Sequence, residues 1–255
     1  MMEIVEDELT HIDRAFSGNE LLASAPKEAR ALLEPFGTLV ELKADAALHP
    51  KGVPVVASYF PFGSTMISFV VELAAGRSIE VASVGSEGAV GGIVSCGHAP
   101  AFAEARVQIG GPAMKIPMQA LEDAKMRSGH IRNLFCRFSD YLLAQVMQSV
   151  ACNNFHTIEQ RAARWLLTAQ DRGGDRIELT QGELAGLLGA QRTTVNAAIQ
   201  SLQEQGLIET RRGAIQVIDR AGLKRLTCAC YGAVRQHFSD VIGADGLGGS
   251  NNECG

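Results

Sequence analysis

The chain has 255 residues, of which 46% are hydrophobic and 20% charged, and its net charge is −5. This composition is typical of a folded protein rather than a disordered or fibrous one, and the length allows two modest domains. No apolar run reaches the roughly 18 residues that a membrane span needs, and the acidic start MMEIVEDELT is unlike a secretory signal. We therefore expect a cytoplasmic protein with no membrane partner.

The charge is unevenly distributed along the chain. Residues 155–225 carry ten Arg and Lys against eight Asp and Glu, so this segment is about +2 and the remainder about −7. The asymmetry is mild, but DNA affinity depends on where basic groups point rather than on the sum of charges. The acidic total therefore leaves nucleic-acid binding open.

The first part of the chain predicts a short helical segment followed by a β-roll. Residues 1–36 are polar with short apolar stretches, which indicates one or two helices. Residues 37–127 contain β-rich runs separated by glycine turn signals, among them Gly91-Gly92 and Gly110-Gly111-Pro112, and end in a short helix after Pro117. The expected strands are TLVEL (38–42), SFVVEL (68–73), SIEVASV (78–84) and EARVQI (104–109).

A long helix is expected over residues 128–153. Apolar residues recur at three-to-four spacing on one face, which is typical of a dimer seam. The alternative is that this face packs on the β-roll of its own chain. The residues of the face are Ile131, Leu134, Phe135, Phe138, Leu142 and Gln145.

Residues 153–157 interrupt the helical pattern, and we interpret them as a hinge between domains. Thr157 suits the N-cap of a helix over 157–171, whose end is marked by Gly173-Gly174. Residues 154–225 form the second expected domain, which residues 226–242 follow as a C-terminal helix. The Gly-rich tail 243–255 is expected to be disordered.

Within this second domain, residues 179–203 predict a helix-turn-helix. Thr180 and Glu183 form a capping-box pattern for the first helix, and Gly189 stands where the tight turn is required. Gln191 then opens a second helix, which buries an apolar stripe at i, i+4 and i+7. That stripe consists of Val195, Ile199 and Leu202.

The first turns of the second helix present polar side chains outward, as a recognition helix does in the DNA major groove. Arg192 suits guanine O6 and N7, Thr193 a thymine methyl or base amine, and Asn196 adenine N6 and N7. Each good bidentate contact discriminates between bases by roughly 1–3 kcal/mol. We assign phosphate contacts or helix capping to Gln191 and Thr194, and also expect Thr180 at a phosphate.

The segment GLIETRRGAIQVID (206–219) predicts a β-hairpin that completes a winged helix. Its tip carries Arg211 and Arg212, which we place near a backbone phosphate. A solvated turn is the alternative for these two arginines.

The six cysteines show no CxxC pair, so we interpret them as reduced thiols and expect no metal site. Cys228 and Cys230 are two residues apart and would point to opposite sides of a helix, which argues against a shared metal.

Two other functions compete with DNA binding. A cupin-like metal enzyme needs converging histidines and a carboxylate, but the chain has no HxH motif and its only HxxE, His156 to Glu159, lies in the hinge. A winged-helix adaptor for protein contacts would be expected to expose apolar residues where Arg192 and Asn196 stand. We therefore expect neither, and no catalytic residues.

In domain order, the chain resembles the Crp/Fnr family of bacterial transcription regulators over about residues 30–225. The most specific similarity is LTQGELAGLLGAQRTTVNAAIQSLQEQGLI (179–208), and SFVVELAAGRSIEVASVGSEGAVGG resembles the family's sensor domain. The resemblance implies an α+β fold with a cyclic-nucleotide-binding-like β-roll (jelly roll), a dimerisation helix and a winged helix-turn-helix. It also implies a homodimer on palindromic double-stranded DNA, with RNA polymerase as a candidate partner.

The resemblance also bears on individual residues. Arg192 falls on the family's guanine-reading arginine, whereas the family's frequent Glu and second Arg are Thr193 and Ala197 here. An effector pocket would include Glu87, Gly91 and Arg106. Whether the protein activates or represses stays open.

The sensor domain departs from members that bind cyclic AMP. The Arg-Ser or Arg-Thr that holds the cyclic phosphate is absent, and Glu104 stands at that place, so cyclic AMP is not expected. Residues 1–95 lack cysteine, so an N-terminal iron–sulfur cluster is not expected. His49 and His98 are haem-ligand candidates, although a single histidine is more often structural.

Overall fold

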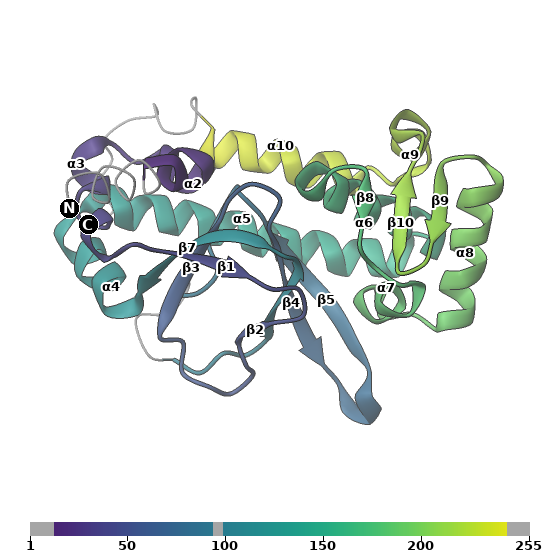
Figure 1. Cartoon of the computed structure of the whole chain (residues 1–255), viewed down its shortest axis with the longest axis horizontal. Helices are drawn as coiled ribbons and strands as arrows, with labels where there is room; N and C mark the ends of the chain where they lie inside the picture. Colours follow the sequence, from purple (N-terminus) through teal and green to yellow (C-terminus); the bar gives the residue numbers. More distant parts are fainter. Residues whose placement is uncertain (1–12, 94–98, 244–255) are drawn as a thin grey trace.

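The computed structural model describes residues 13–93 and 99–243, and it divides into a β-roll, a long central helix and a C-terminal helix–sheet domain (Figure 1). Before the β-roll, residues 13–18 are helical and three short helices follow. These are α2 (Glu20–Ala23), α3 (Lys27–Arg30) and the 3-10 helix η1 (Glu34–Phe36). The α+β class expected from the sequence is confirmed.

The β-roll contains two antiparallel sheets, ordered β1-β7-β3 and β2-β6-β4-β5. Their inward residues, such as Phe60 and Ile67, build one core. The strands are β1 (Thr38–Leu42), β2 (Ala47–His49), β3 (Ala57–Pro61), β4 (Met66–Glu72), β5 (Ser78–Val84), β6 (Glu104–Ile109) and β7 (Gly111–Pro117).

The strands expected at 38–42, 78–84 and 104–109 are confirmed, and the run expected at 68–73 is β4, shifted by a residue or two. The turn expected at Gly110-Gly111-Pro112 is misplaced, because β7 already begins at Gly111 and pairs with β1. Gly111 has φ 154°, a backbone conformation that side chains with a Cβ rarely adopt. Gly111 therefore stands at the start of β7, where its backbone conformation lets the chain enter the strand.

The short helix expected after Pro117 is α4 (Met118–Arg127), which packs on the β-roll, and α5 (Gly129–Phe155) runs along most of the molecule (Figure 1). Ser128 caps α5, its side chain accepting a hydrogen bond from the Ile131 amide at 3.3 Å. The hinge expected at 153–157 is too long, because α5 continues through Phe155. Only His156 and Thr157 separate it from the next helix.

The apolar face that we assigned to a dimer seam is buried inside the chain itself, which corrects that expectation. Its six residues are at most 9% exposed and pack on the β-roll, with the Phe135 and Phe60 rings 6.1 Å apart. Gly88 shows how close this packing is, because a Cβ there would lie 2.0 Å from Phe138. The alternative, packing on its own β-roll, is the structure observed.

The C-terminal domain surrounds a second core that includes Trp165, Leu188 and Ile199. Thr157 caps α6 through a capping box with Gln160, as the sequence predicts for its N-cap. The elements of the domain are α6 (Ile158–Gly173), β8 (Arg176–Ile177), α7 (Gln181–Leu188), α8 (Arg192–Glu204), β9 (Ile208–Arg211), β10 (Ala214–Val217) and α9 (Arg220–Leu226).

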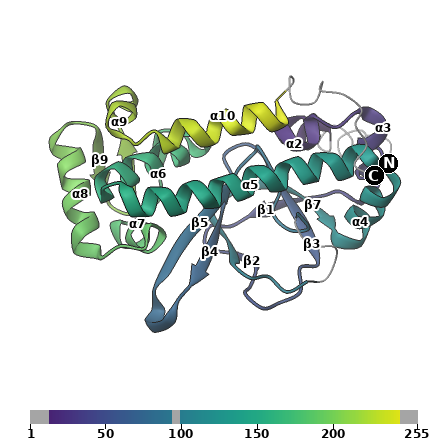
Figure 2. The same cartoon turned by 180° about the vertical axis from the view of Figure 1, so that it is seen from behind.

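The last helix, α10 (Cys230–Ile242), leaves this domain and returns alongside α5 toward the β-roll (Figures 1 and 2). The Phe238 ring packs on Tyr141 of α5 at 5.0 Å, and Ile242 is buried in the core that the β-roll shares with α5 and the N-terminal helices. The expected C-terminal helix at 226–242 is therefore real but begins four residues later.

The β4–β5 hairpin also reaches the C-terminal domain. A Cβ on Gly189, at the end of α7, would lie 2.8 Å from Ile79 of β5. No helix within the described residues has the length and hydropathy that a bilayer span requires.

Candidate nucleic-acid interface and interdomain cavity

Helices α7 and α8 form the helix-turn-helix predicted from the sequence. Thr180 Oγ1 accepts from the Glu183 amide at 3.2 Å, while the Glu183 carboxylate accepts from the Thr180 amide at 2.6 Å. The turn begins at Gly189, which is left-handed with φ 60°. The expected capping box and the tight glycine turn are both confirmed.

Helix α8 buries one face and exposes the other at the end of the molecule (Figure 1). Val195, Ile199 and Leu202 are buried, as expected. The exposed side chains of its first two turns include Arg192, Thr193, Thr194 and Asn196. The structure thus brings the predicted base-reading residues onto one outward surface.

Arg192 is held close to the start of α7 without a charged partner among the described residues. A Cβ added to Gly182 would lie 3.6 Å from the Arg192 guanidinium carbon. Gln191 is the N-cap of α8, and its side chain makes no capping hydrogen bond. The guanidinium and the first amides of α8 therefore remain available to a ligand outside the chain.

The predicted wing is the β9–β10 hairpin, with its turn at Arg212-Gly213. Gly213 has φ 72°, which the tight turn requires. Arg211 pairs with Glu209 at 3.0 Å, and both side chains are about half exposed. Arg212 is exposed beside it, so the tip presents positive charge to solvent.

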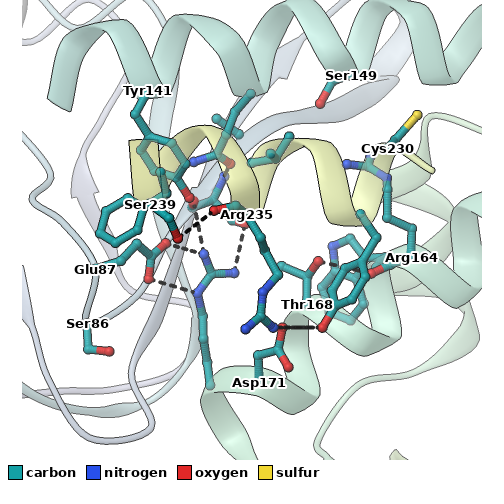
Figure 3. A pocket seen from close by; sticks show the side chains of 18 of the residues that line it. Ser86, Glu87, Tyr141, Ser149, Arg164, Thr168, Asp171, Cys230, Arg235 and Ser239 are labelled. Atoms are coloured by element: carbon teal, nitrogen blue, oxygen red, sulfur yellow. Dashed lines mark hydrogen bonds and ion pairs between the residues drawn. The ribbon is translucent and has the colours of Figure 1, made fainter. Parts of the chain in front are cut away.

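A cavity of about 430 Å³ lies where the β-roll, α5, α6 and α10 meet (Figure 3). Charged side chains of both signs line it, from the β-roll, α6 and α10 and from α2. Those of α6 and α10 form a network around Asp171, which accepts from Arg235 at 2.8 Å and from the Tyr231 hydroxyl at 2.7 Å. The charged lining residues are Glu20, Glu80, Glu87, Arg164, Asp171, Arg172 and Arg235.

Two side chains of α6, Arg172 and Trp165, make polar contacts across this cavity and join the β-roll to the C-terminal domain. Arg172 of α6 pairs with Glu87 and donates to Ser83 Oγ at 3.2 Å. Trp165 Nε1 donates to Glu80 Oε2 at 3.2 Å, and Ser68 donates to the same oxygen. Burial raises the pKa of Glu80, which those two hydrogen bonds only partly oppose.

The cavity wall also contains an amide nitrogen with no partner. Gln145 of α5 is buried and accepts from the Ser83 amide at 3.4 Å, whereas its Nε2 has no hydrogen-bond partner among the described residues. A buried donor left without a partner costs roughly 1–3 kcal/mol, so this nitrogen favours a polar ligand or water in the cavity.

The structure does not bring the three expected effector residues together. Only Glu87 lines the cavity. Gly91 lies against His49 and the Ala57 carbonyl, and Arg106 on β6 pairs with Glu104 at 2.6 Å. His49 is buried near the Val90 carbonyl, and burial lowers its pKa. His98, Cys96, residues 1–12 and most of the tail at 243–255 lie outside the described residues.

Sequence reasoning missed the cavity-lining Arg172, Asp171 and Arg235. In the sequence they are ordinary polar positions of a helical pattern, and their partners lie far away along the chain: Glu87 for Arg172, and Asp171 for Arg235. Cys228 and Cys230 do not point to opposite sides of one helix, as was expected, because Cys228 precedes α10.

Comparison with known proteins identifies the type of the C-terminal domain. The family model of the Crp-like helix-turn-helix domain matches residues 160–226. No curated protein matches the chain. Among solved structures, FixK2 from Bradyrhizobium japonicum is 18% identical with a TM-score of 0.63, covering 76% of this chain and 98% of its own.

Two further structures share the fold. A transcriptional regulator of the Crp/Fnr family from Eubacterium rectale is 17% identical with a TM-score of 0.62, over 81% of this chain and 96% of its own. The c-di-GMP-responsive regulator CLP from Xanthomonas campestris is 15% identical with a TM-score of 0.61, over 76% of this chain and 100% of its own.

The matched domain is a DNA-binding helix-turn-helix domain of the Crp-like type, which supports a role in transcription regulation. Residues 160–226 are a Crp-like helix-turn-helix domain, and the whole chain has the architecture of the Crp/Fnr regulators. The resemblance seen in the sequence is thereby confirmed.

Proposed function

We propose that the protein binds palindromic DNA as a homodimer and reads each half-site with α8. The observation that carries this proposal is the division of α8 into a buried apolar face and an exposed polar one. Arg192, Thr193 and Asn196 occupy the exposed face in the first two turns, which are the turns that contact base edges in a major groove.

The side chains on this face indicate what each half-site contains. The free guanidinium of Arg192 suits a guanine, and the carboxamide of Asn196 suits an adenine. Phosphate contacts are assigned to residues around them, which set the register of the protein on DNA. These are Thr180, Gln191, Thr194, Arg211 and Arg212.

The homodimer uses a face of α5 other than the one first expected. Leu143, Met147 and Val150 are 51%, 61% and 58% exposed and follow one another at spacings of four and three residues. This spacing suits a two-helix seam, and a second copy supplies the same stripe across a two-fold axis. Such an axis would present two α8 helices to successive major grooves.

The cavity between the β-roll and α6 is the place where a ligand would act on DNA binding. Its walls belong to both units, so a ligand there changes the contacts of Arg172 and Trp165 directly. The unpartnered Gln145 amide supports a polar ligand with an acceptor group. We propose gating through this cavity, which Glu87 lines, in place of a pocket that would also include Gly91 and Arg106.

The test is selection of bound sequences from random duplex DNA by wild type and by Arg192→Ala. We expect wild type to enrich a palindrome, and the variant to lose discrimination at one base pair in each half-site, by roughly 1–3 kcal/mol. Gln200→Ala, exposed farther along α8, is the matched control and should keep the motif. Equal weak binding to every sequence by wild type would contradict the proposal.

A further inference from the structure

We propose a structural zinc site where α5 meets the C-terminal domain, held by three thiolates and one imidazole. The site stands apart from both the recognition helix and the dimer stripe, so it does not rest on the proposed function. The four ligands are Cys152, His156, Cys228 and Cys230.

The ligands come from two segments far apart in the sequence. Cys152 lies in the last turn of α5, and His156 is the cap residue that follows this helix, its amide donating to the Cys152 carbonyl at 3.1 Å. Cys228 lies in the short loop after α9, and Cys230 begins α10 at one end of the cavity (Figure 3). The return of the chain between α9 and α10 brings the two pairs together.

Two of the six distances among the four ligand atoms match the edges of a zinc tetrahedron, and the other four are short enough for small side-chain adjustments to reach it. The four metal-binding atoms all lie within 4.8 Å of one another. Zn–S bonds of about 2.3 Å and Zn–N bonds of about 2.0 Å imply S–S edges of ~3.8 Å and S–N edges of ~3.5 Å. The Cys152 and Cys228 sulfurs are 3.6 Å apart, and Cys230 Sγ is 3.5 Å from His156 Nδ1.

The surroundings suit bound thiolates. Cys152, Cys228 and Cys230 are 0%, 5% and 3% exposed, so they are protected from solvent. Gln148 Nε2 donates to Cys230 Sγ at 3.0 Å, the kind of outer contact that orients a metal ligand. Three thiolates and Zn²⁺ leave one negative charge, and Arg161 and Arg164 are near enough to act electrostatically on Cys152.

The donor set selects the metal and its role. Sulfur and imidazole donors in a four-ligand arrangement favour Zn²⁺, and a site with all four positions filled by protein is structural rather than catalytic. Binding displaces the thiol protons to solvent. The metal would fasten the start of α10 to the end of α5, two residues before the first turn of α6.

The test begins with the full-length wild-type chain, purified under reducing conditions, and its zinc content by elemental analysis. We expect one zinc per chain. Replacement by Co²⁺ should give the visible absorption of a tetrahedral ion and a thiolate-to-cobalt band in the near ultraviolet. A wild-type chain that neither retains zinc nor gives this cobalt spectrum would overturn the proposal.

Variants locate the ligands and separate binding from folding. Cys228→Ser and Cys230→Ser should weaken zinc binding by more than about 100-fold, since loss of an outer-shell contact alone costs about 10–100-fold. Cys136→Ser, exposed on α5, is the matched control and should retain the metal. His156 is half-buried, so His156→Ala should fold and lose metal, whereas His156→Cys should keep it.

The same arrangement of sulfurs would also allow a disulfide between Cys152 and Cys228. Under non-reducing conditions, mass analysis of the wild-type chain distinguishes the two. A metal-free chain with this disulfide would overturn the zinc site, as would equal loss of zinc in Cys136→Ser and Cys228→Ser.

Discussion

Arg172 on α6 forms an ion pair with Glu87 at the end of the β-roll sheet, and both side chains are largely buried. The same guanidinium donates to Ser83 Oγ at 3.2 Å, so one side chain of the DNA-binding domain contacts two residues of the β-roll. Glu87 in turn accepts from the Gly85 amide at 3.0 Å, which fixes the loop that bears it. The two units are therefore joined by a charged contact and not only by the covalent chain.

Removing Arg172 should both weaken the fold and alter DNA binding. Arg172→Ala leaves the Glu87 carboxylate buried without its partner, and breaking a buried pair in this way costs about 3–5 kcal/mol. Urea denaturation should show the lower unfolding free energy. DNA affinity should change as well, although α8 is untouched, because the DNA-binding domain loses its attachment to the β-roll.

The control for Arg172→Ala is Arg176→Ala, which breaks the pair with Glu178 on the surface of the same domain. Exposed pairs contribute about 0–1 kcal/mol, so this variant should unfold near the wild type. If Arg172→Ala and Arg176→Ala lost similar amounts of unfolding free energy, the contact with Glu87 would contribute no more stability than an exposed pair.

Glu80 should make the stability of the protein depend on pH. Its pKa is raised by burial, so the folded chain holds this proton more strongly than the unfolded chain. The contribution of Glu80 is then fully present below the ordinary carboxyl pKa and is lost as pH rises through the raised value. Glu80→Gln keeps an oxygen acceptor for Trp165 and Ser68 and should be more stable than wild type at neutral pH.

The measurement is thermal unfolding of both proteins across the acidic range. The advantage of Glu80→Gln should shrink as the pH falls and the wild-type carboxyl becomes protonated. Glu178→Gln, on the exposed surface, is the comparison. If the difference in unfolding temperature between Glu80→Gln and wild type did not change with pH, the pKa of Glu80 would not be raised in the folded protein.

The wing arginine should contribute affinity without specificity. Arg212→Ala removes a phosphate contact, so binding should weaken about equally for all sequences, and the slope of log K against log salt should fall by about 1. Titrations at several salt concentrations on specific and random duplexes measure both effects. Arg176→Ala has the same charge change on the same domain and should leave the slope unaltered. A loss confined to one sequence would assign Arg212 to base reading instead.

The two faces of α5 should respond differently to substitution. Phe138 is fully buried on the β-roll, so Phe138→Ala should cost about 3–5 kcal/mol of unfolding free energy. Leu143→Glu, on the exposed stripe, should leave the circular dichroism unchanged and convert a dimer to a monomer by sedimentation. Ala233→Glu, at an exposed position of α10, adds the same charge, and this variant should stay dimeric. A dimeric Leu143→Glu protein would place the seam elsewhere.

The predictions from sequence succeeded where the signal was local. The capping box at Thr180 and Glu183, the glycine turn and the apolar stripe of α8 are each set by residues a few positions apart, and all are confirmed. The strand that begins at Gly111 was missed because its pattern is also that of a turn. Its pairing with β1 depends on contacts about 70 residues away in the chain, which local propensity does not report.

The predictions that failed are those about which part of the protein packs against a given surface or side chain. The periodicity of α5 shows an apolar face but not whether a β-roll or a second helix covers it, and the packing of Phe138 against Gly88 decides that. The cysteine pattern misled for a similar reason. A helix over both Cys228 and Cys230 was assumed, whereas a loop precedes α10 and lets Cys228 turn toward Cys152.

The path of α10 limits how the DNA-binding domain can move. A domain joined by one connection can swivel about it in many directions. Here the chain arrives through α5 and departs through α10, and the last residue of that helix, Ile242, is buried in the core that the β-roll shares with α5 and the N-terminal helices. Two attachments side by side allow tilting about the line between them and resist twisting. A ligand bound in the proposed interdomain cavity would thus tilt the DNA-binding domain rather than let it rotate freely.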